Sequence, residues 1–206
     1  MSACALEQGN GGHYCQSISM AEHMGSHVDA PSHKHPHLMH QTVDRMPVTA
    51  LIGRAVVYHF GDLGLAAGDM VTRGDILAYE SHEGVAVGGD EIALLDFDWM
   101  RYWSTGRDAH WYASNQPGLS EEAVRLFQER GVKAVGADTL ACETALKDGV
   151  ELAAYGHNKH WLPNGIYIVE ELANLGSLPN EVFFMALPLN IVQGSGSPVR
   201  AIAFLP

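Results

Sequence analysis

A short stretch near the N-terminus limits what this chain can fold into. His23, His27, Asp29 and His33 fall within eleven residues, and every interval between them is even. On an α-helix these positions would drift onto different faces, and Pro31 also disfavours a helix there. In an extended segment, side chains at even intervals point to the same side. The spacing therefore predicts an extended or bent segment that directs all four side chains toward one place.

Histidine and aspartate in this arrangement indicate a divalent metal site. Imidazole nitrogen and carboxylate oxygen are ligands that Zn²⁺ prefers, and Mn²⁺ or Fe²⁺ also accepts them. The alternative is a His-rich surface loop with non-specific metal affinity, because seven of the 12 histidines lie between His13 and His40. Asp29 argues against it, since one carboxylate can bridge two ions in a catalytic site. His35 and His37, like His40, are the candidates for plain surface residues.

The chain resembles a known family over this stretch. The order His23-x-Gly-Ser-His27-x-Asp29-x-Pro31-x-His33 is similar to the signature HxG[TS]HxDxPxH of the cyclase-like metal-dependent hydrolases. Bacterial kynurenine formamidase and isatin hydrolase belong to that family. Later segments also resemble family segments, in the family's order: residues 118–123, 135–139, 165–172 and 186–201. The resemblance covers roughly residues 20–206.

The resemblance implies a fold and an assembly. It implies one α/β domain over residues 20–206, a mixed sheet flanked by helices in a swivelling β/β/α arrangement, and a homodimer or homotetramer. A length of 206 residues suits one domain. Residues 1–19 are polar and Gly-rich, which predicts a poorly structured N-terminal segment. Relatives usually have a further strand before the metal motif. Here either the sheet lacks that strand or a neighbouring subunit covers the gap.

The resemblance also implies roles for individual residues. His23, His27 and Asp29 would bind a first metal ion. Asp29 and Glu170 would bridge to a second ion, and Glu170 stands at the family's E-x-L position. His33, the last residue of the motif, would be the catalytic general acid and base.

The histidine for the second ion is offset from the family pattern. Counted back from Gly165, the family's spacing falls on Asn158, which leaves His157 and His160 as candidates. His157 is preferred because it is the nearer of the two. The cofactor implied is therefore one or two divalent ions, Zn²⁺ or Mn²⁺.

Hydrophobic patterns and capping residues predict the main elements. Strands are expected at residues 54–60, 91–97, 132–135, 182–187 and 199–204. One helix is expected after the N-cap Thr72, and another between Ser120 and Gly131. Residues 142–160 are expected to be helical or irregular.

A strand at residues 166–170 would place a carboxylate among apolar side chains. Ile166, Ile168 and Glu170 share one face of such a strand. A buried carboxylate is costly without a cation, so a metal ion is the favoured partner. The alternative is that Glu170 lies at a solvated end of the strand.

Residues 98–117 are rich in aromatic side chains, with Trp99, Trp103 and Trp111 among them. Their Gly, Ser, Asn and Pro content predicts a long loop, and long ordered loops are often functional. The aromatic faces would suit a flat ring in a substrate pocket. The alternative is a plug over a sheet edge or a subunit interface.

Charge and cysteine content exclude several classes of protein. Lys and Arg number 12 against 24 Asp and Glu, so the formal net charge is −12. Such an acidic chain is not expected to bind nucleic acid or anionic membranes. The odd set Cys4, Cys15 and Cys142 fits no disulfide framework, which favours a cytoplasmic protein. The N-terminus lacks the pattern of a secretory signal, and no apolar run is long enough to span a membrane.

The ligand set predicts hydrolysis by metal-activated water. A divalent cation lowers the pKa of bound water from 15.7 toward about 7, and it stabilises the oxyanion that forms at an attacked carbonyl. The resemblance implies a C–N bond in a small amide, formamide or cyclic amide. Lactone or cyclic imide hydrolysis is the alternative with the same chemistry. Lys34 follows His33 where the family usually has Phe, which weakens the transfer of either named substrate.

A non-catalytic His-rich metal-binding protein is the alternative of a different class. It would need His35, His37 and His40 as additional ligands and would not need Glu170. An inactive scaffold is disfavoured, because the row of ligands from His23 to His33 is intact.

Overall fold

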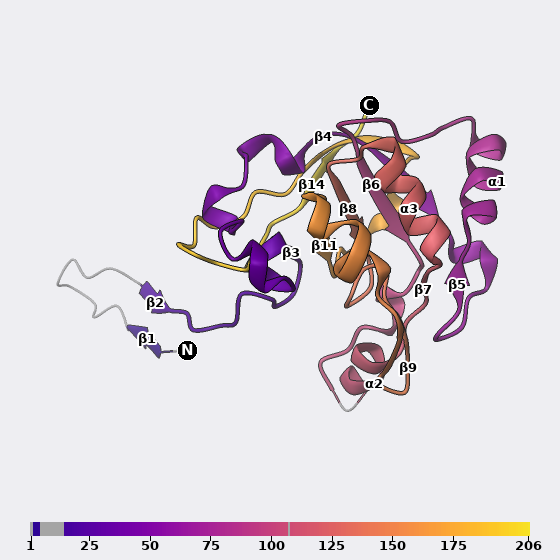
Figure 1. Cartoon of the computed structure of the whole chain (residues 1–206). Coiled ribbons are helices and arrows are strands. Elements are labelled where there is room, and N and C mark those ends of the chain that lie inside the picture. The colour runs from indigo at the N-terminus through magenta and orange to yellow at the C-terminus, as the bar shows by residue number, and fades with distance from the viewer. Residues whose placement is uncertain (1, 5–14, 107) are drawn as a thin grey trace.

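One mixed β-sheet of eight strands forms the centre of the computed structural model, which describes residues 2–4, 15–106 and 108–206 (Figure 1). In spatial order the strands are β13 (Gly196–Pro198), β3 (His27–Asp29), β11 (Tyr167–Glu170), β8 (Ala134–Ala137), β6 (Ile92–Asp96), β4 (Ile52–His59), β12 (Glu181–Met185) and β14 (Ile202–Phe204). The four central strands are parallel, and the pairs toward both edges are antiparallel. The predicted single α/β domain with a mixed sheet is confirmed.

A buried core lies on each face of the sheet. Successive strand residues point to opposite faces, so Tyr58 and Val57 of β4 belong to different cores. Tyr58 packs with Ile76 of α1 (Arg73–Glu83) and Phe127 of α3 (Glu121–Arg130). Val57 packs with Leu175, which lies in the connection between β11 and β12. The two helices therefore cover one face, and connecting segments cover much of the other.

Local sequence sets where the two long helices begin and end. The Thr72 hydroxyl accepts the Asp75 backbone N–H, and the Asp75 carboxylate accepts the Thr72 N–H in return. Ser120 caps α3 by accepting the N–H of Ala123. Gly131 ends α3 in the left-handed conformation, at φ +71°. Both caps and this helix end agree with the sequence prediction.

Two predicted segments differ from the structure. Residues 142–160 contain a hairpin of β9 (Ala145–Lys147) and β10 (Val150–Ala153), followed by a π-helix at Gly156–His160. Residues 199–204 are not one strand: β13 ends at Pro198 and β14 begins at Ile202. The break arises because β13 pairs with β3 and β14 pairs with β12, at opposite edges of the sheet.

Shorter elements complete the described chain. Residues 98–117 are largely loop, as predicted, but include α2 (Ala109–Ser114) and a 3-10 turn at Met100–Tyr102. β5 (Met70–Val71) pairs with β7 (Gly118–Leu119) in a small parallel sheet. No helix among the described residues is long and apolar enough to cross a membrane.

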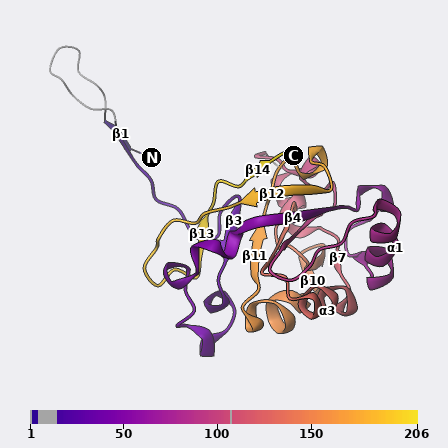
Figure 2. The same cartoon turned by 90° about the horizontal axis from the view of Figure 1, so that it is seen from above.

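The N-terminal segment lies apart from the main sheet. β1 (Ser2–Cys4) and β2 (Cys15–Ser17) pair antiparallel, and both views show them away from the body of the molecule (Figures 1 and 2). Most of the predicted poorly structured segment, residues 1–19, lies outside the described residues.

Candidate metal centre

The register of two neighbouring strands places three acidic and basic side chains together. In the antiparallel pair of β3 and β11, His27 lies opposite Glu170 and Asp29 lies opposite Ile168. His27 and Asp29 are two residues apart, so they project to the same side of β3. Glu170 is only 5% exposed, so it does not lie at a solvated strand end. The expected carboxylate on a buried face of this strand is present.

Bends on both sides of β3 bring in two further histidines. Gly25 has φ +60°, a conformation that glycine adopts easily, and its carbonyl accepts the His27 Nδ1–H at 2.7 Å. After β3, the chain turns through a short 3-10 helix at Pro31–His33. The rings of His23 and His33 consequently lie 3.9 Å apart between centroids. The segment is extended only at β3 and bends elsewhere, and it still gathers all four motif side chains.

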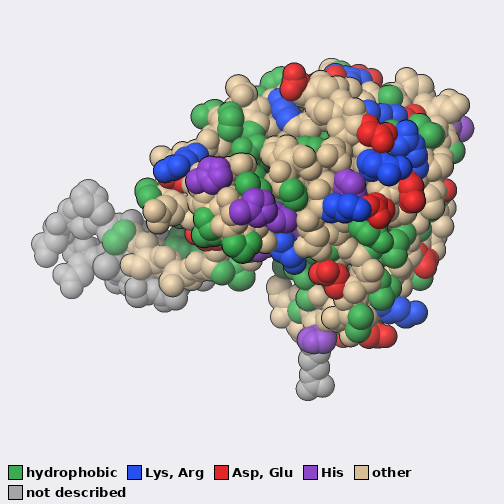
Figure 3. All heavy atoms as spheres, viewed as in Figure 1, with side chains coloured by type: hydrophobic (Ala, Val, Ile, Leu, Met, Phe, Trp, Pro, Cys, Tyr) green, Lys and Arg blue, Asp and Glu red, His purple; other side chains and the backbone are tan. Residues whose placement is uncertain are grey.

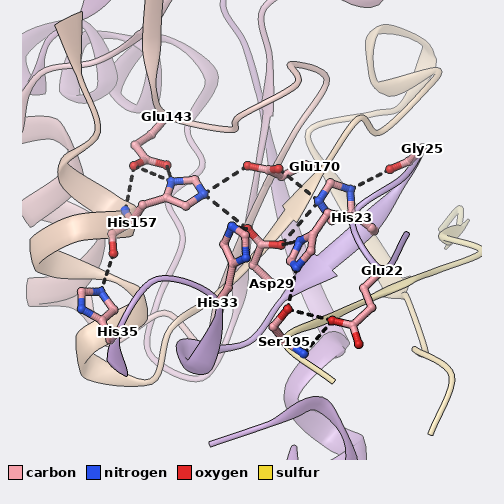
Figure 4. Close-up of polar contacts among 11 residues, drawn as sticks. Glu22, His23, Gly25, Asp29, His33, His35, Glu143, His157, Glu170 and Ser195 are labelled. Carbon is pink, nitrogen blue, oxygen red and sulfur yellow. Dashed lines mark hydrogen bonds and ion pairs between the residues drawn. The ribbon is translucent and has the colours of Figure 1, made fainter. Parts of the chain in front are cut away.

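Asp29 lies at the centre of the cluster (Figure 4). Its Oδ1 is 2.6 Å from His23 Nδ1 and 3.4 Å from His27 Nε2. Its Oδ2 is 3.3 Å from His157 Nε2. The Glu170 carboxylate completes the group, at 3.2 Å from His27 Nε2 and 3.3 Å from His157 Nε2. Among the described residues, two sets of three potential ligands result and share Asp29: His23, His27 and Asp29; and Asp29, His157 and Glu170.

The cluster lacks hydrogen bonds that its buried atoms require. Both carboxylate oxygens of Asp29, Oε1 of Glu170 and Nδ1 of His23 are buried without a hydrogen-bond partner among the described residues. The histidine nitrogens are thus close to the Asp29 and Glu170 carboxylates, but the angles of these contacts do not suit hydrogen bonds. Unsatisfied buried carboxylate oxygens are costly, and a cation between them would satisfy them. Imidazole nitrogens and carboxylate oxygens fit Zn²⁺ or Mn²⁺, so the residues present fit the implied metal.

Contacts between the imidazoles and the carboxylates shift the pKa values of Asp29 and His27. Burial by itself would raise the pKa of Asp29, but the imidazoles of His157, His23 and His27 hold that pKa well below its usual range. Burial would lower the pKa of His27, but Asp29 and Glu170 raise it to about 10. A divalent cation at this place would supply positive charge to both carboxylates and would displace protons from its histidine ligands, as metal binding to histidine generally does.

Of the histidines proposed for the second ion, the structure brings only His157 to the cluster. It lies in the π-helix and is buried. His160 points elsewhere: its Nδ1 lies 2.7 Å from Gln128 Oε1, and its Nε2 lies 3.2 Å from Glu121 Oε1. Both of those partners belong to α3.

Sequence reasoning missed two residues that contact the predicted ligands, and a third, Glu22, that contacts one of these two. Glu143 contacts the far side of the His157 ring, at 3.0 Å from Nδ1. Ser195 Oγ lies 2.9 Å from His23 Nε2 and donates to Glu22 Oε2 at 2.7 Å. Glu143 and Ser195 are distant from the motif in the sequence, so no spacing rule connects them to it. Glu22 directly precedes His23, but an acidic neighbour alone is a weak signal.

The remaining histidines of the His-rich run lie outside the cluster. His37 and His40 are exposed. His35 is partly buried, and its Nε2 lies 2.7 Å from the His157 carbonyl oxygen, so it supports the π-helix. Several histidine side chains reach the surface on the face shown in Figure 3.

The aromatic segment forms a cluster of its own. Trp99 is buried and stacks on Trp111 at 5.6 Å between ring centroids, and the Tyr102 ring lies 4.7 Å from that of Trp111. Trp103 and Trp111 are about half exposed. The contacts of these rings within the described part of the chain do not reach the candidate metal centre.

Comparisons with known proteins found one matching family and similar hydrolases. The family described as putative cyclase matches residues 3–144. The chain is 26% identical to an isatin hydrolase from Roseibium aggregatum, over 91% of this chain and 73% of the relative. It is 28% identical to a kynurenine formamidase from Paracidovorax citrulli, over 92% of this chain and 79% of the relative. The solved structure of isatin hydrolase A from Labrenzia aggregata bound to benzyl benzoate superposes with a TM-score of 0.84, at 29% identity, covering 99% of this chain and 82% of that one.

Proposed function

The chain belongs to the putative cyclase family, and from this premise we propose that it hydrolyses a C–N bond in a small amide, formamide or cyclic amide. Its similarity to isatin hydrolase and kynurenine formamidase, which spans most of each relative, supports this reaction class. It is an enzyme of the metal-dependent amidohydrolase type. The two candidate types of substrate are an aryl formamide and a cyclic amide such as isatin.

One observation carries the proposal: Asp29 is shared by two sets of potential ligands, and Glu170 completes the second set. We propose His23, His27 and Asp29 as ligands of one ion, and Asp29, His157 and Glu170 as ligands of a second. Zn²⁺ and Mn²⁺ are the candidate ions. A divalent cation held there supplies Lewis acidity, which makes water a better nucleophile at neutral pH and polarises a carbonyl oxygen.

His33 is the proposed catalytic acid and base. Its Nε2 is 3.9 Å from Asp29 Oδ2, further than the proposed ligands, and 33% of its side chain is exposed. It can therefore contact both the cluster and an incoming substrate. Burial lowers the pKa of His33, which favours the neutral imidazole that accepts a proton. That proton would then pass from His33 to the departing nitrogen.

Assembly and compartment are also proposed here. Trp103 and Trp111 leave apolar surface exposed on a segment outside the sheet, which supports a homodimer or homotetramer. Cys15 and Cys142 are both free thiols, which supports a cytoplasmic location.

A panel assay tests the function. Chelator-treated protein is reloaded with Zn²⁺ or Mn²⁺ and offered N-formylkynurenine, isatin, a cyclic imide and an aryl lactone. We expect metal-dependent turnover of at least one of the two C–N substrates, and slower turnover of the imide and lactone. Metal-loaded protein that turned over none of them would contradict the proposal. Turnover of the lactone alone would assign the chain to the alternative reaction.

A non-catalytic His-rich metal-binding protein is the weaker reading. It would recruit His35, His37 and His40, but two of these are exposed and the third contacts a backbone carbonyl. It also gives no role to Glu170, whose buried carboxylate faces His27 and His157.

A further inference from the structure

A fully buried carboxylate lies behind His157, on the side away from the proposed metal ligands. Glu143 has 0% exposure, and both its oxygens are near His157 Nδ1, at 3.0 and 3.1 Å. Figure 4 shows the imidazole between Glu143 on one side and the Asp29 and Glu170 carboxylates on the other. The Nδ1 edge of the ring therefore faces Glu143, and the Nε2 edge faces the cluster.

Glu143 contacts the main chain of the same residue as well. Its Oε1 accepts the backbone N–H of His157 at 2.9 Å. The carboxylate thus contacts both the backbone and the ring of one histidine, which limits rotation of the side chain about its first two torsions. None of the hydrogen bonds or ion pairs found among the described residues gives the Glu143 carboxylate a lysine or arginine partner.

The surrounding chain is shaped to admit this carboxylate. A Cβ at Gly156 would lie 2.6 Å from Glu143 Cδ and 2.4 Å from Trp161 Cε3, so only glycine leaves room there. Gly156 also begins the π-helix, whose wide turn is closed by the Trp161 N–H donating to the Gly156 carbonyl at 2.8 Å. Single π-turns occur frequently at functional sites.

We infer that Glu143 is a positioning residue, which holds His157 with Nδ1 as the donor so that Nε2 is the atom presented to a metal ion. This inference rests on the proposed function, because it takes His157 as a ligand. In a neutral imidazole, one ring nitrogen has the hydrogen and the other has the lone pair that can bind a metal ion. A carboxylate hydrogen-bonded to Nδ1 keeps the hydrogen on Nδ1 and the lone pair on Nε2. Carboxylates placed in this way commonly orient metal-bound histidines, and their loss costs about 10–100-fold in metal affinity.

Metal titration of the full chain distinguishes the effect of Glu143 on the orientation of the His157 ring from the effect of its negative charge. The apo protein is titrated with Zn²⁺ and with Mn²⁺ by calorimetry, for the wild type, Glu143→Ala, Glu143→Asp and Glu143→Gln. We expect the Ala variant to bind about 10–100-fold more weakly. Asp keeps the charge but is one methylene too short, so it should resemble Ala. Gln keeps an acceptor at the right distance and should remain closer to the wild type.

Glu80→Gln is the matched control. Glu80 is a largely buried carboxylate paired with Arg130 and hydrogen-bonded to Tyr58, and it does not contact the cluster. Its loss should lower the melting temperature of the apo protein but leave metal affinity within about twofold of the wild type. Comparing the two sites shows whether lost affinity at Glu143 reflects general destabilisation.

A spectroscopic readout tests the orientation directly. In Zn²⁺-loaded protein labelled with ¹⁵N-histidine, His157 should give a slowly exchanging Nδ1–H signal, identified by its loss in His157→Gln. That signal should be absent in Glu143→Ala and present, with a changed shift, in Glu143→Gln. Unchanged metal affinity in all three Glu143 variants, or a retained Nδ1–H signal in Glu143→Ala, would overturn the inference.

The outcomes for site and function are distinguishable. If the wild type binds metal, and Glu143→Ala and Glu143→Asp bind it more weakly than Glu143→Gln does, the inference holds even when no substrate is turned over. If the wild type binds neither Zn²⁺ nor Mn²⁺, both the inference and the metal-dependent function are wrong.

Discussion

Glu170 lies directly opposite His27 across the antiparallel pair of β11 and β3, and its Oε2 is 3.2 Å from His27 Nε2. This register joins a motif near the N-terminus to a carboxylate late in the chain. A slip of one residue would turn Glu170 to the opposite face of the sheet, because side chains alternate along a strand. The buried neighbours Val28 and Val169 fix the register, since they occupy the core on that opposite face.

Replacing Glu170 by Gln should impair both metal binding and hydrolysis. The amide keeps the shape but removes the negative charge that faces His27 and His157. We expect metal affinity to fall by more than the roughly 10–100-fold typical of outer-sphere partners. Calorimetric titration and the substrate assay measure the two effects.

His37→Ala is the control for Glu170→Gln, because His37 belongs to the same His-rich run but is exposed. Its metal affinity and turnover should match the wild type. If His37→Ala lost as much metal as Glu170→Gln, the non-catalytic metal-binding alternative would be favoured.

His33→Gln should separate catalysis from metal binding. The His33 ring is the most distant from Asp29 among the histidines of the cluster and is partly exposed. We therefore expect metal affinity to stay within about threefold, while kcat falls by about 10²–10⁴-fold, the usual range for loss of a general acid or base. Loss of metal from His33→Gln would instead make His33 a ligand.

The sequence predicted which side chains come together where the signal lies in neighbouring residues. The even spacing from His23 to His33 indicated convergence, and the apolar alternation around Glu170 indicated a buried carboxylate. Both features are local in the sequence, and the alternation of side chains along a strand determines which face each residue lies on. Thr72 and Ser120 were predictable as caps for the same reason, since each bonds within three residues.

The sequence predicted less where long-range packing decides. The family's spacing falls on Asn158, and His157 was preferred only as the nearer histidine; His157 is the residue that faces Asp29. The π-helix at Gly156–His160 has a wider turn than an α-helix, so it can absorb a one-residue offset, and no propensity rule signals such a turn. Glu143 was missed because its role depends on the hairpin of β9 and β10 that follows it.

Removing the metal should destabilise the protein. Asp29 and Glu170 have buried oxygens without hydrogen-bond partners, so a bound ion would stabilise the folded state. At a free metal concentration of about 100 times Kd the stabilisation is about 2.7 kcal/mol. For a domain of this size that corresponds to about 5–10 °C in Tm, measured by calorimetry with and without chelator. A chelator-insensitive Tm in protein shown to bind metal would contradict the buried-ligand arrangement.

His59, whose hydrogen bonds go to Asp96 and Leu178 rather than to any proposed metal ligand, should make stability depend on pH. Its Nδ1 lies 2.8 Å from Asp96 Oδ2 and its Nε2 lies 3.1 Å from the Leu178 carbonyl oxygen. Both partners are acceptors, so only the protonated ring satisfies both. The hydrogen bond to Asp96 raises the pKa of His59, and Glu83 adds to this effect.

The sign of the His59 effect follows from the raised folded-state pKa. The unfolded chain has a His pKa of about 6.5, so the stabilisation is fully present below that pH and is lost as pH rises through the higher folded pKa. We expect the difference in unfolding free energy between wild type and His59→Gln to decrease above about pH 6.5. Urea denaturation of chelator-treated protein from about pH 5.5 to 9 measures this difference. His40→Gln provides the control, because His40 is exposed. A difference that stayed constant or grew with pH would show that His59 is not held as the protonated ring.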